Sequence, residues 1–167
     1  IELKAHVNQI GDIEAPDVSF EQMLEHSEDN EVRCAHPETA DRMRERIEQY
    51  QKEGDSIGGS VEFEVRGVPR GLGAPRFDSM TARLGQAMMS VPAATAFEFG
   101  LGREARRYRG SERNEDWEFD EDGDPVPVGN DHGGIQGGIT TGQPIRGEVT
   151  IHAPTSIPKA QTTVDWE

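Results

Sequence analysis

Runs of alternating apolar and polar residues predict the strands of this chain. The clearest run is residues 60–66, SVEFEVR, in which apolar and charged side chains fall on opposite faces. The apolar set is Val61, Phe63 and Val65, and the charged set is Glu62, Glu64 and Arg66. Residues 3–10, 95–99 and 143–152 alternate more loosely. The inward positions expected in the last run are Ile145, Val149 and Ile151.

Two segments carry apolar residues at spacings of three and four, which is typical of amphipathic helices. The first follows Pro37 and ends at Gly54, with apolar positions at Ala40, Met43, Ile47 and Tyr50. The second is expected to be capped by Asp78 and to end at Pro92. Its apolar positions are Met80, Leu84, Ala87, Met88 and Val91. One further helical turn is expected at residues 20–24.

The periodic pattern stops between residues 100 and 129. A block of arginines is followed by an acidic tract over residues 115–124. The arginines are Arg103, Arg106, Arg107 and Arg109. Adjacent blocks of opposite charge favour a solvated segment, so we expect 103–129 to be a mobile loop.

The order of the elements indicates the fold class. Strand, helix, strand, helix, strand, long loop and strand follow one another over residues 1–167, which we interpret as a single piece. This order predicts an α+β fold in which two helices pack on a mostly antiparallel sheet.

The composition is acidic and poor in lysine. Hydrophobic residues make up 33%, and 32 acidic against 17 basic residues give a net charge of −15. Molar salt screens such self-repulsion to about 3 Å, so this composition favours a protein from a salt-loving organism. An ordinary acidic protein with one acidic loop is the alternative. Either way, the charge argues against binding nucleic acid or an anionic membrane.

The single cysteine and the lack of long apolar runs bear on the cellular compartment of the protein. Cys34 alone cannot form an intramolecular disulfide, and no apolar run is long enough to span a bilayer. We therefore expect a cytoplasmic protein. Because Ile1 is not a natural start, we also expect further residues upstream.

Two polar segments are candidates for ligand binding. The glycine cluster 133–145, GGIQGGITTGQPI, can bring backbone amides close to an anion or a flat ring, although the composition alone favours a flexible turn. The segment 152–165 offers hydroxyls to a phosphate, or is simply a surface loop. The arginine block at residues 103–109 can bind an anionic ligand, or it can be a solvated helix face. The five histidines, scattered along the chain, lack metal-ligand spacing: His6, His26, His36, His132 and His152.

Four segments taken together resemble the chorismate synthase family. They are RGVPRGLGAPRFDSMTARLGQAMMSVPAATAFEFG (66–100), RGSERN (109–114), NDHGGIQGGITTGQPI (130–145) and HAPTSI (152–157). The last three are similar to the family patterns RGSExND, NxxGGIxGGISxGQPI and KPTxSI, in the same order. The resemblance implies a piece of the family's β-α-β sandwich, a layered fold of two antiparallel sheets enclosing helices.

The resemblance also implies an activity. Chorismate synthases convert 5-enolpyruvylshikimate 3-phosphate to chorismate by 1,4-elimination of phosphate, a lyase reaction of the shikimate pathway that supports aromatic amino acid biosynthesis. The reaction requires reduced FMN, for which NADPH is a candidate reductant, and the enzymes are homotetramers. A non-catalytic ligand-binding or assembly domain on a related fold is the alternative.

Eight residues match flavin-binding positions of the family. They are Pro92, Ala93, Gly137, His152, Ala153, Pro154, Thr155 and Ser156. His152 stands where the family usually has lysine, and a neutral imidazole would weaken an anion contact. The family's two catalytic histidines and several substrate-binding arginines belong to segments outside this sequence. We therefore expect no catalytic residue within it, and expect the chain alone to be inactive.

Overall fold

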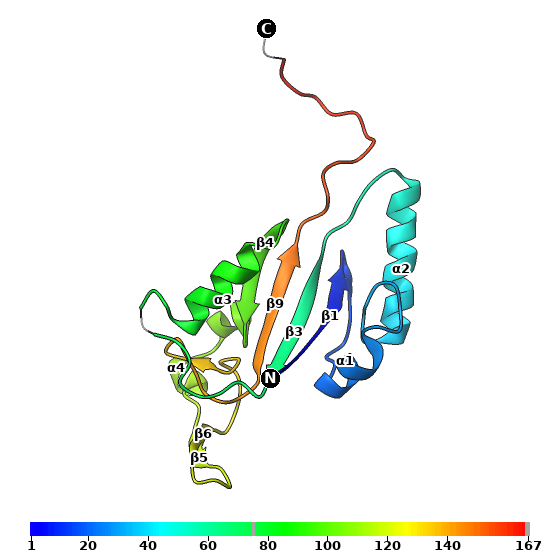
Figure 1. Cartoon of the computed structure of the whole chain (residues 1–167). Coiled ribbons are helices and arrows are strands. Elements are labelled where there is room, and N and C mark those ends of the chain that lie inside the picture. Colours follow the sequence, from blue (N-terminus) through cyan, green and yellow to red (C-terminus); the bar gives the residue numbers. More distant parts are fainter. Residues whose placement is uncertain (75, 166–167) are drawn as a thin grey trace.

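The structure is a computed structural model that describes residues 1–74 and 76–165. A five-stranded antiparallel sheet in the order β2-β1-β3-β9-β4 forms its centre (Figure 1). The strands are β1 (Glu2–Ile10), β2 (Ile13–Glu14), β3 (Gly59–Arg66), β4 (Ala94–Phe99) and β9 (Ile145–Ile151). The four predicted strands are thus confirmed.

Three helices pack on this sheet, and polar residues cap each of them. They are α1 (Phe20–His26), α2 (Pro37–Lys52) and α3 (Met80–Met89). Ser19 and Gln22 form a capping box at α1, and the imidazole of His36 accepts from the Thr39 amide at α2. The cap of α3 is Ser79, whose side chain accepts from the Ala82 amide, so the prediction of Asp78 was wrong by one residue.

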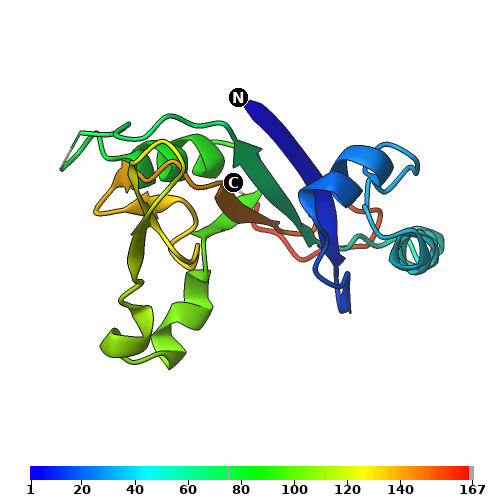
Figure 2. The ribbon, with the colours of Figure 1, turned by 90° about the horizontal axis from the view of Figure 1, so that it is seen from below.

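One face of the sheet is apolar and packs against α3. Phe63, Ile145 and Val149 are buried at its centre. Met80, Leu84 and Met88, spaced four residues apart on α3, cover them. Helices α1 and α2 lie at the opposite end of the sheet, beside β1 and β2 (Figures 1 and 2). The antiparallel sheet with packed helices confirms the α+β prediction.

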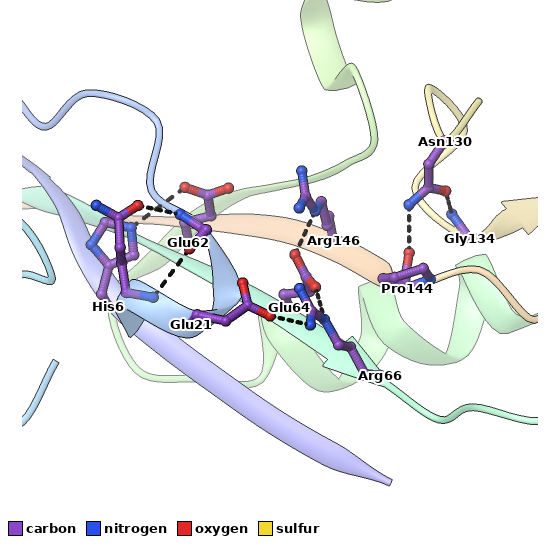
Figure 3. A network of polar contacts seen from close by, with 11 residues as sticks. His6, Glu21, Glu62, Glu64, Arg66, Asn130, Gly134, Pro144 and Arg146 are labelled. Atoms are coloured by element: carbon purple, nitrogen blue, oxygen red, sulfur yellow. Dashed lines mark hydrogen bonds and ion pairs between the residues drawn. The ribbon is translucent and has the colours of Figure 1, made fainter. Parts of the chain in front are cut away.

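The other face of the sheet is charged (Figure 3). Glu62, Glu148 and Glu98 stand opposite one another on β3, β9 and β4. Next to them Glu64 is only 1% exposed, although the alternating pattern predicted a polar face there. Its two oxygens accept from Arg66 Nε and Arg146 Nε, each at 2.6 Å. Two guanidinium groups therefore compensate a carboxylate that the sheet buries.

The segment between β4 and β9 contains short elements where the sequence predicted none. These are the 3₁₀ helix η1 (Gly102–Arg107), α4 (Gly110–Arg113), the hairpin β5 (Trp117–Phe119) and β6 (Pro125–Pro127), and the hairpin β7 (Ile135–Gln136) and β8 (Ile139–Thr140). The β5–β6 hairpin projects from the body (Figure 1). Arg70, in the turn that follows β3, nevertheless forms an ion pair with Asp120 at the tip of this hairpin, with Nη2 and Oδ2 2.6 Å apart. Mobility of 103–129 remains a prediction.

Candidate functional site

Two of the predicted flavin-binding segments meet at the end of α3. Ala93 adopts a left-handed conformation with φ of 68°, which turns the chain from α3 into β4. Its carbonyl accepts from the His152 amide at 3.0 Å. The pair Pro92–Ala93 and the segment that starts at His152 are therefore neighbours, although they lie far apart in sequence.

The segment 152–156 continues from β9 along the residues that precede β3. Ser56 Oγ donates to the Pro154 carbonyl. Gly58 permits this approach, because a β-carbon there would lie 2.9 Å from the Ala153 amide nitrogen. Thr155 and Ser156 are exposed, so their hydroxyls are free to meet a ligand. Beyond them the chain extends away from the sheet (Figure 1).

Gly137 lies at the other end of α3. It forms the turn between β7 and β8 with φ of 58°, and the next carbonyl, that of Gly138, accepts from the Met80 amide at 2.7 Å. The 10 residues of α3 span about 15 Å at 1.5 Å per residue. The structure therefore separates Gly137 from Ala93 by the length of a helix.

An asparagine holds the base of the β7–β8 hairpin. Asn130 donates to the Pro144 carbonyl at 2.8 Å and accepts from the Gly134 amide at 2.7 Å (Figure 3). Gly134 has φ of 76°, and a β-carbon there would lie 2.6 Å from the Pro144 oxygen. The hairpin therefore requires glycine at this position, whereas a β-carbon at Gly137 would meet nothing within 4 Å. Gly137 thus presents an open backbone.

A cavity of about 630 Å³ lies beside Gly137. Aromatic side chains of β4 line it together with charged side chains of both signs, since the carboxylates of Glu98 and Asp131 accompany the arginines. Its lining includes Phe97, Phe99, Arg103, Arg113, Asp131 and His132. One arginine of the predicted block, Arg103, therefore reaches a cavity, while Arg107 pairs with Glu104 at 2.7 Å on the surface.

Behind the cavity, Glu115 accepts three hydrogen bonds. Its Oε1 accepts from the Asp131 amide at 2.7 Å, and its Oε2 lies 3.0 Å from His132 Nδ1 and 2.9 Å from Gln136 Nε2. Burial alone would raise the pKa of Glu115, but the hydrogen bonds from His132 and the Asp131 amide outweigh it and hold this pKa below its ordinary value. Glu115 is therefore ionised at neutral pH.

Sequence reasoning did not single out Glu115, Arg113 or His132 as partners in one site. Arg113 Nη1 is buried without a hydrogen-bond partner in the described part of the chain, and lies 3.4 Å from Asp131 Oδ2. The only available signal was that these residues fall in or next to the motifs RGSERN and NDHGG. Their spacing in sequence did not indicate contact.

None of the helices over residues 1–74 and 76–165 is long and apolar enough to cross a bilayer. Within the same ranges, no three His, Cys, Asp or Glu side chains are grouped to hold a metal ion.

The fold and the cavity together define a class of protein. An α+β layer with an open glycine turn beside arginine, histidine and carboxylate side chains has the form of a polar ligand-binding domain. The chorismate synthase profile matches residues 1–167, and the chain therefore belongs to the chorismate synthase family.

Relatives with this name are similar along the whole chain. The chorismate synthase of Haloquadratum walsbyi is 77% identical over 167 residues, covering 100% of this chain and 44% of that protein. That of Halobacterium salinarum is 69% identical, with 100% and 45% covered. That of Methanosarcina mazei is 47% identical, with 99% and 45% covered. The expected kinship with halophilic proteins is thus confirmed, and the chain spans less than half the length of these relatives.

A solved structure supports the fold. The structure described as "Crystal Structure of Chorismate Synthase" superposes with a TM-score of 0.82 at 33% identity, covering 91% of this chain and 49% of the other. The chain therefore has the fold of about half of a chorismate synthase subunit, and the family is one of lyases.

Proposed function

We propose that this chain is part of an enzyme that converts 5-enolpyruvylshikimate 3-phosphate to chorismate by 1,4-elimination of phosphate. The observation that carries this proposal is the uninterrupted family match over residues 1–167, with 77% identity to a named chorismate synthase. The geometry adds support, since Ala93 and His152 come from two separate motifs and share a hydrogen bond of 3.0 Å.

The proposed cofactor is reduced FMN, with NADPH as a candidate reductant. When bound, the reduced flavin supplies the electron that assists the loss of phosphate. The chain's own residues fit such a group. Thr155 and Ser156 expose hydroxyls, and the backbone at Gly137 is open because a β-carbon there meets nothing within 4 Å. Pro92–Ala93, Gly137 and residues 152–156 would line one wall of the flavin site.

His152 is the residue in this wall that differs most from the family pattern. Its Nδ1 lies 2.7 Å from the Ala153 carbonyl, which can only accept, so this nitrogen carries a proton. A neutral imidazole contributes a hydrogen-bonding nitrogen where lysine would contribute a full charge. We therefore infer that Thr155, Ser156 and backbone amides, rather than His152, contribute most to binding an anionic group.

The acid–base residues of the reaction belong, in this proposal, to the part of the enzyme that this chain does not span. General acid–base catalysis needs a titratable group beside the reacting atoms. His6 and His36 do not supply one, because His6 is buried and His36 caps α2. We also propose a homotetramer in the cytoplasm, in which further segments complete the cationic pocket and exclude water.

The test is an anaerobic turnover assay. A parent-length protein that contains this chain is supplied with 5-enolpyruvylshikimate 3-phosphate and reduced FMN in molar KCl, and chorismate is measured by its absorbance. We expect chorismate only when the flavin is reduced. A folded protein that releases no phosphate under these conditions would refute the proposal.

A matched pair of variants locates the flavin wall. Thr155→Val removes one exposed hydroxyl of the candidate site, whereas Thr95→Val changes a hydroxyl that contacts the Thr150 carbonyl on the sheet. We expect weaker FMN binding for Thr155→Val and wild-type binding for Thr95→Val. Equal affinities in the two variants would remove residue 155 from the site.

A further inference from the structure

Glu115 is surrounded by hydrogen-bond donors only. The Asp131 amide faces one of its oxygens, and Gln136 Nε2 and His132 Nδ1 face the other. An ionised carboxylate can only accept hydrogen bonds. His132 Nδ1 must therefore carry a proton to contact it at 3.0 Å. In a neutral ring this leaves Nε2 without a proton, as an acceptor.

The cavity beside Gly137 then has a defined polarity. His132 and Arg113 both line it. Arg113 Nη1 is buried and pairs with Asp131 Oδ2 at 3.4 Å, but it has no hydrogen-bond partner in the described part of the chain, so this donor is only partly compensated. The lining thus offers the guanidinium of Arg113 to an anion, beside the carboxylate of Asp131, and the imidazole of His132 as an acceptor for a hydroxyl or ring N–H.

We propose that Glu115 is a positioning residue: it fixes His132 in the Nδ1–H tautomer, so that Arg113 and His132 Nε2 together bind a phosphate ester that also bears hydroxyl groups. FMN, through its ribityl phosphate, and the enolpyruvyl substrate both have this chemistry. The inference rests on the proposed function for the identity of the ligand. The tautomer itself depends only on the geometry around Glu115.

Replacing Glu115 by glutamine breaks this arrangement while it retains the shape of the side chain. The amide has one accepting oxygen and one donating nitrogen, so one of the two positions must now donate. If the glutamine NH₂ group faced the Asp131 amide, two donors would oppose each other, because a backbone N–H cannot become an acceptor. Donation toward the position that His132 and Gln136 share is accommodated if the ring changes to the Nε2–H tautomer and the Gln136 amide turns its oxygen toward the new donor. Glu115→Gln is therefore expected to invert the tautomer.

The tautomer is measured by long-range ¹H–¹⁵N correlation on the chain labelled with ¹⁵N-histidine, at a pH high enough for the ring shifts to stop changing. His132→Asn assigns the signal. We expect Nδ1–H in the wild type, Nε2–H in Glu115→Gln, and no change in Glu118→Gln, which alters an exposed carboxylate on β5. An Nε2–H ring in the wild type overturns the proposal by itself, even if the variant fails to fold.

A second experiment measures ligand affinity in the parent-length enzyme. The dissociation constant of FMN and the KM of the substrate are compared for wild type, Glu115→Gln and Glu118→Gln. Losing one hydrogen bond of about 1.4 kcal/mol corresponds to a tenfold change. A tenfold rise in either constant, for Glu115→Gln alone, supports the proposal and tells which ligand occupies the cavity.

If both constants stay unchanged while the tautomer inverts, Glu115 does not position a binding group and the proposal fails. The proposed function fails separately, if the wild-type enzyme itself forms no chorismate.

Discussion

The buried carboxylate of Glu64 is expected to stabilise the sheet, and Glu64→Gln tests this. The side chain is 2% exposed and bridges Arg66 and Arg146, each at 2.6 Å (Figure 3). Because both partners use Nε, which can only donate, an amide nitrogen must oppose one of them. The variant loses one charge-assisted hydrogen bond and weakens the other.

The expected loss in the free energy of unfolding depends on the partners that Arg66 and Arg146 retain in the variant. A hydrogen bond to a charged group contributes about 1.5–3 kcal/mol. Arg146 is 51% exposed and can turn to water, while Arg66 keeps Glu21 at 2.6 Å. Neither guanidinium is therefore left buried and unpaired. We expect the free energy of unfolding to fall by about 2 kcal/mol. For a chain of this size that lowers Tm by roughly 4–8 °C.

The assay is thermal unfolding followed by circular dichroism in molar KCl. Glu148→Gln is the control, because Glu148 lies two residues from Arg146 on β9 and faces Glu62 and Glu98 instead of an arginine. We expect no loss of stability in the control. A Tm for Glu64→Gln within about 1 °C of the wild type would refute the stabilising role.

Three further predictions concern charge and backbone. Glu148→Gln should raise Tm at low salt and have little effect in molar salt, because like charges opposite one another on β3 and β9 repel and salt screens them; equal effects at both salt concentrations would contradict this. Gly134→Ala should lower the free energy of unfolding, measured with urea, by more than Gly137→Ala. Both have positive φ, but only the first β-carbon would meet the Pro144 oxygen, at 2.6 Å. The contribution of Glu115, whose folded pKa is lowered, should be fully present above its unfolded pKa of about 4.5 and lost as pH falls through the folded value. The stability difference between wild type and Glu115→Gln should therefore shrink on acidification, and a difference independent of pH would argue against it.

The sequence predicted those parts of the fold whose signals are local. Alternation identified β3, and the spacing of Met80, Leu84 and Met88 identified the face of α3 that packs on the sheet. Both signals arise from one side of an element meeting the core.

The burial of Glu64 depended on contacts that no local pattern contains. Its partner Arg146 lies 82 positions away and reaches it only because β3 and β9 are paired in this register. Alternation alone assigns such a carboxylate to solvent, because it describes one strand at a time.

The candidate site was predicted only in part for the same reason. Motif resemblance supplied Ala93 and the segment from His152, and the structure brings these together. It did not reveal that Glu115 joins the glycine hairpin through His132, since that contact depends on how the 100–131 segment folds back. The short elements of this segment carry too few periodic positions to be recognised.

The central claim is that this chain supplies one wall of a flavin site that further segments complete. The direct measurement is a titration of FMN, in molar KCl, into the 167-residue chain and into a parent-length protein that contains it. A single wall leaves the ring exposed to water, and each 1.4 kcal/mol lost weakens binding about tenfold. We predict micromolar affinity for the parent-length protein and at least about hundredfold weaker binding for the chain alone. Micromolar binding by the chain alone, or none by the parent-length protein, would contradict the account.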